Sequence, residues 1–296
     1  METHRGPQQD PPETENTGMT TSRQAERPKR PPLIPDQRRE LLLKHLRRDG
    51  VLSVQQVKQL FGVSHMTVRR DIAELEQQGL VFSVPGGVRI ASHVPHEPTF
   101  QAKSLTEQRE KRAMAREADT LLRDGMTVYL DAGTTLHALV PHLAEHRELT
   151  VVTNDFNAVE LLCGARHLEV IHIGGRVEPD NRSSVGRLAA ATVSHLALDT
   201  AFISTSSWDL IRGVTTPSEQ KVEVKQAAMA AASQSVLVAG ASKYGTFGKY
   251  KVAALRSFDV IITDTGLTEA AAEGVRGEGP DLRLVPPAPE TDAGES

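Results

Sequence analysis

Apolar residues from about residue 36 onward recur at helical spacing and are interrupted by short turns. Three leucines form one stripe of a helix predicted over residues 36–48, with Asp36 as its N-cap. Ser53 is placed to cap a second helix that ends at Gly62, and Ser64 is placed to cap a third. Two short helices around a glycine-bearing turn predict a helix-turn-helix.

The third predicted helix, which runs to about Gln78, has two distinct faces at 100° per residue. Val68, Ile72 and Leu75 fall within a narrow sector and are expected to face the core. The opposite face carries Met66, Arg69, Arg70, Ala73 and Gln77. An apolar stripe that fixes the helix, with hydrogen-bond donors pointing away from it, is what a recognition helix in the major groove of DNA needs.

Two apolar segments follow this helix and flank a glycine-bearing turn. Residues 80–84 and 88–90 predict two antiparallel strands around Pro85-Gly86-Gly87, which form a wing. Arg89 on the second strand is expected to approach the DNA backbone or minor groove. An isolated pair such as Arg69-Arg70 is usually a solvated surface, but its place in a helix-turn-helix followed by a wing favours DNA binding.

From residue 106 onward, short β-branched runs alternate with helices. After a helix over 106–122, the predicted strands are 127–130, 150–153, 170–173, 201–204, 235–239 and 260–263, and the predicted helices are 135–143, 156–162, 188–196 and 223–232. This alternation is typical of a doubly wound, mostly parallel α/β sheet. The fold class expected is therefore an N-terminal winged helix-turn-helix joined to an α/β domain.

Composition sets the expected domain boundaries. Residues 1–32 are polar and proline-rich and are predicted to be a disordered tail. The remaining divisions are a winged helix over 33–91, a linker over 92–99 that two prolines keep from being helical, an α/β domain over 100–284 and a flexible tail over 285–296.

Charge sharpens this division. The net charge of the whole chain is −4, which by itself argues against nucleic acid, but residues 23–90 carry 13 basic and 7 acidic side chains. The DNA-binding module is thus basic, and the rest of the chain is acidic. Cys163 is the single cysteine, which excludes a disulfide framework and fits a reducing cytosol. We find no apolar run of ~18 residues and no secretory leader, so a cytoplasmic protein is expected.

Small and polar residues gather where the predicted parallel strands end. Ligands bind at that edge of such sheets, and glycines, hydroxyls and a lysine there are suited to a phosphate group. Each motif alone is more simply turn or capping chemistry, but their shared position favours a common pocket. The residues expected to line this pocket are Asp131, Gly133, Thr134, Thr135, Thr153, Asn154, Gly174, Gly175 and Lys243.

The segment VSHMTVRRDIAELEQQGLV, followed by PGG, resembles the signature of DeoR-type bacterial transcriptional regulators. The matching positions are Val63, Ser64, Thr67, Val68, Arg69, Arg70, Asp71, Ile72, Leu75 and Gly79. The resemblance continues through the α/β domain to about residue 265. It implies a sensor domain similar in fold to sugar-phosphate isomerases and coenzyme A transferases, which binds a phosphorylated sugar or related metabolite. By the same resemblance, the nine residues expected to line the pocket would bind this effector.

Four positions depart from the family pattern. Ser83 and Pro85 stand where the family wing commonly has Arg and His, and Gly240 stands where the family has Asp before the Ser-Lys pair. Lys221 aligns with a position that is usually acidic. The first two bear on wing contacts to DNA, and the last two bear on how sugar hydroxyls are recognised.

These observations predict a DNA-binding transcriptional regulator, a repressor of a carbohydrate-metabolism operon, that binds double-stranded operator DNA as a homo-oligomer, a dimer or tetramer. Arg69 and Met66 are expected to reach base edges, and Ser64, Thr67 and Arg70 to hold phosphates. The alternative is a sugar-phosphate isomerase-like enzyme with an appended domain, in which Asp131 or Glu219 would be the base. An enzyme has no use for a winged helix. We expect no cofactor, and no metal-ligand spacing is present.

Overall fold

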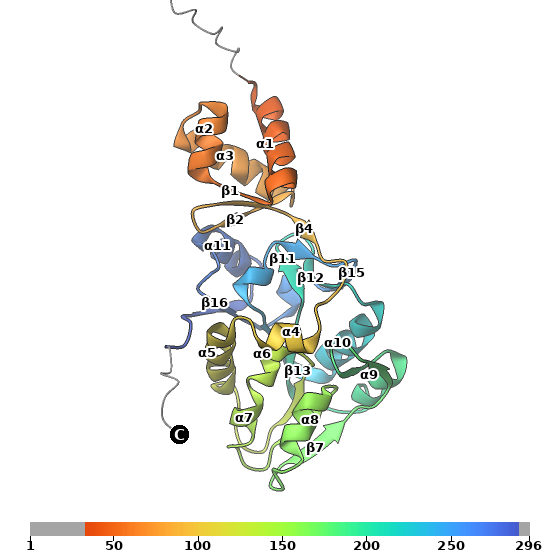
Figure 1. The fold of residues 1–296 in the computed structure, drawn as a ribbon. Helices are drawn as coiled ribbons and strands as arrows, with labels where there is room; N and C mark the ends of the chain where they lie inside the picture. The colour runs from red at the N-terminus through yellow and green to blue at the C-terminus, as the bar shows by residue number, and fades with distance from the viewer. Residues whose placement is uncertain (1–32, 290–296) are drawn as a thin grey trace, which may run out of the picture. The chain divides into compact units, whose positions relative to one another are not determined.

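The structure is a computed structural model that describes residues 33–289 (Figure 1). The tail predicted over residues 1–32 lies outside the described residues, as does the last part of the C-terminal tail, 290–296.

The N-terminal module contains three helices and a small antiparallel sheet. Its elements are α1 (Pro35–Asp49), β1 (Val51–Ser53), α2 (Val54–Phe61), α3 (His65–Gln77), β2 (Val81–Val84) and β3 (Gly87–Ile90). The strands pair in the order β1-β3-β2. The side chains of Leu46, Val68 and Val88, from α1, α3 and β3, meet in one apolar core. The predicted winged helix-turn-helix is present.

Two of the three predicted helix caps hold. Ser53 makes a reciprocal capping box with Gln56, and Ser64 accepts a hydrogen bond from the amide of Thr67. The prediction that Asp36 caps the first helix is wrong, because α1 begins one residue earlier at Pro35, and Asp36 instead pairs with Arg39 in the first turn. Proline suits a first helical position because no hydrogen bond is lost there.

The larger module is built on a seven-stranded parallel sheet. Its strands are β5 (Thr127–Leu130), β6 (Thr150–Thr153), β7 (Glu169–His172), β10 (Leu198–Ser204), β13 (Ala232–Val238), β16 (Val260–Asp264) and β17 (Asp281–Val285). They lie in the order β17-β16-β13-β10-β5-β6-β7, and every pair is parallel. The predicted fold class is confirmed.

Helices cover both faces of this sheet. One face carries α5 (Gln108–Asp119), α6 (Thr134–His137), α7 (Val140–Leu143) and α8 (Phe156–Leu162), and the other carries α9 (Arg187–Val193), α10 (Glu219–Ala231) and α11 (Glu269–Gly277). Side chains along β5 alternate between the two faces and so contribute to both cores. Val128 and Leu130 point to the first face, and Tyr129 points to the second.

The predicted helix over 106–122 is wrong at its start. The chain instead forms α4 (Phe100–Ser104), and α5 begins at Gln108 because Glu107 has a φ of 51°, which a continuing helix does not allow. The pattern also did not predict α11 or β17, and Ala288 beyond β17 is buried and donates its amide to the Arg109 carbonyl.

Several short strands that the sequence did not predict lie at the carboxyl edge of the sheet. They are β4 (Ser92–His93), β8 (Arg176–Glu178), β9 (Ser183–Val185), β11 (Ser207–Asp209), β12 (Gly213–Thr216), β14 (Thr246–Phe247) and β15 (Tyr250–Ala253). The linker takes part, because β4 pairs with β14 and the amide of Val94 donates to the carbonyl of Phe247 at 2.8 Å. The first residues of the linker therefore run as a short strand against the larger module.

The wing hairpin is buried on both sides. Val81 and Val88 point into the core of the N-terminal module. Phe82, on the other side of the hairpin, is 1% exposed and packs edge-to-face on Tyr244, with ring centroids 5.5 Å apart. The two modules therefore share this hairpin.

A buried ion pair joins α1 to α3 in the N-terminal module. Arg38 donates from two nitrogens to both carboxylate oxygens of Asp71, and the two side chains are 10% and 5% exposed. We expect Asp71→Ala to lower the free energy of local unfolding by about 3 kcal/mol, because it leaves the Arg38 charge buried without its carboxylate. Hydrogen–deuterium exchange of the α3 amides in the full chain measures this change.

Asp36→Ala is the matched control for that substitution. Asp36 also pairs with an arginine, but its side chain is 83% exposed, so the expected change is within about 0.5 kcal/mol. Equal α3 protection in the two variants would show that the buried pair does not hold the module together.

Candidate functional site

The outward face of α3 is exposed as the sequence predicts. Met66 is 71% exposed, and Arg69 and Arg70 are also exposed, whereas Val68 is fully buried on the opposite side. Ile72 is also buried, so the helix has one anchored face and one free face. The free face carries the two arginines and the methionine expected to meet DNA.

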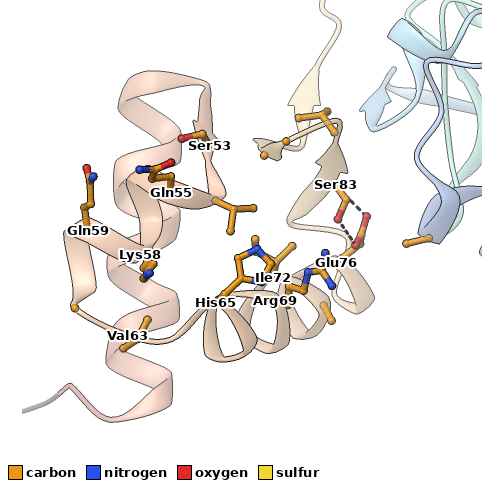
Figure 2. A pocket seen from close by; sticks show the side chains of 17 residues that line it. Ser53, Gln55, Lys58, Gln59, Val63, His65, Arg69, Ile72, Glu76 and Ser83 are labelled. Atoms are coloured by element: carbon orange, nitrogen blue, oxygen red, sulfur yellow. Dashed lines mark hydrogen bonds between the residues drawn. The ribbon is translucent and has the colours of Figure 1, made fainter.

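Two grooves flank this face. One, of about 1240 Å³, lies between α2, α3 and the wing, and Figure 2 shows Lys58 and Gln55 of α2 on one side of it and His65 and Arg69 of α3 on the other. The second, of about 1160 Å³, lies between α1 and α3. Arg69 lines both grooves, so it stands on the ridge between them.

Hydroxyl groups at the start of α3 are held in place by contacts within the helix itself. The Ser64 hydroxyl lies 2.9 Å from that of Thr67 and accepts the Thr67 amide at 3.2 Å. The departure at Ser83 has a structural role, since its amide and hydroxyl both donate to Glu76 at 2.9 Å and tie the wing to α3 (Figure 2).

Arg89 does not lie where the sequence analysis expects it. Its guanidinium donates to the carbonyls of Ser242 and Tyr244 in the larger module, and burial lowers its pKa. The reason is the two-residue period of β3: because Val88 points into the core of the N-terminal module, Arg89 points to the other side of the hairpin, which the larger module covers. In this arrangement the Arg89 guanidinium joins the two modules.

In the larger module, the polar residues meet where the strand order reverses. Successive strands run outward from β5 in one direction through β6 and β7, and in the other from β10 through β13. The carboxyl ends of β5 and β10 are therefore the switch point at which such sheets bind ligands. Asp131 follows β5, and it accepts hydrogen bonds from the amide and hydroxyl of Ser204 at the end of β10, at 2.9 and 2.8 Å.

A small polar cavity lies at this point, and we call it the switch-point pocket. It is lined by Glu97, Asp131, Ala132, Asn154, Asn181, Ser183, Ser204, Thr205, Ser206, Thr216, Lys221 and Lys225. Its volume is about 20 Å³, which is room for about one water molecule. Of the nine predicted effector residues, Asp131 and Asn154 line it.

Four of the other predicted residues lie close by in supporting positions. The hydroxyl of Thr153 donates to the Leu130 carbonyl at 2.7 Å, and the Gly133 amide donates to Asp155 at 3.3 Å. Thr134 and Thr135 are buried in α6. The amides of this turn are partly engaged, since the Ala132 amide donates to Asn154 at 2.8 Å.

Gly174 and Gly175 lie away from the pocket. They follow β7, which is the edge strand and is separated from β10 by β6 and β5. Both have positive φ, and a Cβ on Gly175 would lie 3.0 Å from the Cβ of Ala189. Their role in this structure is to turn the chain and let α9 approach.

Lys243 reaches the pocket wall from the 3₁₀ turn Ala241–Lys243. Its ammonium donates to the carbonyl of Thr205, a lining residue, at 2.8 Å. Burial lowers the pKa of Lys243 to about 8, and the charge of Lys103 acts in the same direction while Glu97 opposes it. Within residues 33–289 no carboxylate lies within 4 Å of this ammonium.

The sequence analysis missed Lys225 of α10 and named Lys221 of the same helix only as a departure from the family pattern. Lys221 and Lys225 are one helical turn apart and both point into the pocket. Lys225 forms a buried ion pair with Asp131 and donates to the Ser204 carbonyl at 2.8 Å. Lys221 pairs with Glu178 at 3.0 Å and with Glu97 of the linker. Their four-residue spacing was the available signal, but an exposed helix face has the same pattern.

The two carboxylates considered for catalysis do not converge. Asp131 is engaged by Ser204 and Lys225, whereas Glu219 is exposed in the first turn of α10 and lines a different surface hollow. Among residues 33–289 we find no group of three or more His, Cys, Asp or Glu side chains that could hold a metal ion. In the same range, every helix is too short or too polar to cross a membrane.

Comparison with known proteins agrees with both modules. The family model for the DeoR-like helix-turn-helix domain matches residues 38–94, and that for the DeoR C terminal sensor domain matches 106–265. Ribose 5-phosphate isomerase A of Methanocaldococcus jannaschii aligns with 45% of this chain and 53% of its own, with 16% identity and a TM-score of 0.34.

Two relatives align with this chain over nearly the whole of their own length. The uncharacterized HTH-type transcriptional regulator YgbI of Escherichia coli K12 is 44% identical over 86% of this chain and 98% of its own. A putative aga operon transcriptional repressor of Escherichia coli O157:H7 is 31% identical over 84% of this chain and 93% of its own. The chain therefore belongs to the DeoR family of helix-turn-helix transcriptional regulators.

Proposed function

We propose that this regulator represses transcription by binding operator DNA as a dimer or higher oligomer, and that a phosphorylated sugar or related metabolite controls it. The observation that carries the proposal is the position of Arg69, which is exposed on the ridge of α3 between two grooves. The module that contains it matches the family model of the DeoR-like helix-turn-helix domain. Repression is supported by the 31%-identical relative, which is named as a repressor.

Each group on α3 suits a different part of DNA. Arg69 has two donors in a fixed fork that match the acceptors of guanine, and the exposed Met66 beside it is suited to an apolar base contact. Ser64 caps α3, Thr67 lies in its first turn and Arg70 is exposed further along the helix. Hydroxyls and a positive charge in these places are suited to holding phosphates and setting the register.

The effector is proposed to bind in the switch-point pocket. Asp131 and Asn154 offer an acceptor and an amide for sugar hydroxyls, and Lys243 supplies a charge for a phosphate. A binding role is favoured over isomerase catalysis because Asp131 is already engaged by Ser204 and Lys225, so it is not free to take a proton from carbon.

Arg69→Ala tests the DNA-binding proposal. A duplex selected from random sequences by the wild-type full chain serves as the probe, with a scrambled duplex beside it. We expect the variant to lose about tenfold or more of the ratio between the two affinities, because the loss of a bidentate base contact removes discrimination. Arg70→Ala is expected to weaken both duplexes to a similar extent. Fluorescence anisotropy measures the affinity of each protein for each duplex.

The control for these variants is Arg112→Ala. Arg112 is exposed on α5, so its loss removes an equal charge from a surface outside the proposed interface. Its affinity ratio is expected to stay at the wild-type value. An unchanged ratio in Arg69→Ala would refute the assignment of α3 as the helix that reads DNA.

Lys243→Ala tests the effector site. Sulfate is a suitable probe because its dianion does not titrate between pH 7 and 9, and calorimetry on the full chain measures its affinity. Since the pKa of Lys243 is about 8, the charged form dominates at pH 7 and is lost by pH 9, so wild-type affinity should fall about tenfold as pH rises. The variant should bind more weakly and show little pH dependence.

Lys249→Ala provides the comparison, because Lys249 lies close in sequence but is exposed. It should keep both the wild-type affinity and its pH dependence. The charged groups that face Lys243 are Lys103, Lys111, Glu97 and Glu107, and they are intact in both variants. A wild-type affinity that stays constant from pH 7 to 9 would argue against Lys243 as the counter-charge.

A further inference from the structure

Glu97 lies in an unusual place for a linker residue. It belongs to the non-helical segment between the two modules, yet its carboxylate accepts hydrogen bonds from the ammonium groups of Lys103 and Lys221, both at 2.5 Å. Its side chain is 15% exposed and lines the switch-point pocket. Burial alone would raise the pKa of Glu97, but Lys221 and Lys103 outweigh it and lower the pKa to about 2.

The other acidic partners of the pocket lysines belong to the α/β fold itself. Asp131 at the end of β5 pairs with Lys225, and Glu178 of β8 pairs with Lys221. Glu97 is different because it is carried by the segment that leads to the DNA-binding module. Within residues 33–289 it is also the only carboxylate that pairs with Lys103.

The size of the pocket adds an independent constraint. A cavity of about 20 Å³ holds about one water molecule, so a phosphate group cannot enter unless a lining side chain leaves. Most lining residues sit at strand ends or on α10, where backbone hydrogen bonds fix them. Glu97 lies between Pro95 and Pro98, outside any helix or strand, so its departure breaks no helix or strand hydrogen bond.

We infer that Lys103 and Lys221 form an anion subsite of the proposed effector pocket, that Glu97 occupies it from within the chain, and that the phosphate group of an effector displaces Glu97. This inference rests on the proposed function, since it assigns the regulation of the same pocket. Glu97 lies between two attachments of the chain to the sensor, because the amides of Val94 and Phe100 donate to the carbonyls of Phe247 and Asp180. Displacement of Glu97 therefore changes the conformation of the stretch between them. The anion thereby acts on the segment that holds the DNA-binding module.

Glu97→Gln in the full chain tests this, with inorganic phosphate as the probe. The substitution keeps the shape of the side chain but removes the competing charge. If the Glu97-displaced arrangement is populated at about a tenth or less, calorimetry should show about tenfold tighter phosphate binding in the variant. In the wild type, saturating phosphate should speed hydrogen–deuterium exchange at the amides of residues 94–100. In the variant, exchange there should already be fast without phosphate.

Glu178→Gln is the matched control, because it removes an equal charge from the same lysine without touching the linker. It should respond to phosphate as the wild type does in the exchange measurement. The inference is overturned if phosphate binds the wild type without changing linker exchange, or if Glu97→Gln binds phosphate no more tightly than Glu178→Gln. Absence of phosphate binding in all three proteins would overturn the proposed effector site as well, so the two failures are distinguishable.

Discussion

The wing hairpin is the element on which the link between the two modules depends. One of its faces fills the core of the DNA-binding module with Val81 and Val88, and the other places Phe82 against Tyr244 and Arg89 on backbone carbonyls of the sensor. A hairpin packed on both faces cannot shift against one module without disturbing the other, because close-packed interiors do not deform freely. Gly245 makes this approach possible, since a Cβ there would lie 2.5 Å from the Phe82 ring.

The turn that Arg89 contacts is also the turn that carries Lys243. Ser242 and Tyr244 flank the lysine, so the proposed counter-charge for an effector and the anchor of the wing lie on adjacent residues. The linker offers a second connection through Glu97. Coupling between sites requires an element with two arrangements that both sites bias. In this protein the 3₁₀ turn and the linker are both in contact with the two modules.

Local patterns predicted much of this architecture and part of the site. Capping at Ser53 and Ser64 depends on neighbouring residues only, and so could be predicted from the sequence. Contacts between distant segments could not: the outer face of β3 shows the same alternation whether water or a second module covers it. For the same reason Lys221 and Glu97, 124 positions apart, carried no shared signal. Strand order explains the misplaced glycines, since β7 lies at the sheet edge.

The linker has a mechanical property that its composition does not suggest. Proline-containing segments between domains commonly act as spacers whose length can vary at little cost. Here the segment is attached to the sensor at Val94 and again at Phe100, and Glu97 lies between the two attachments. The number of residues between them therefore sets where the Glu97 carboxylate can reach. A change of even one residue in the length of this segment would move Glu97 relative to the two lysines that it contacts.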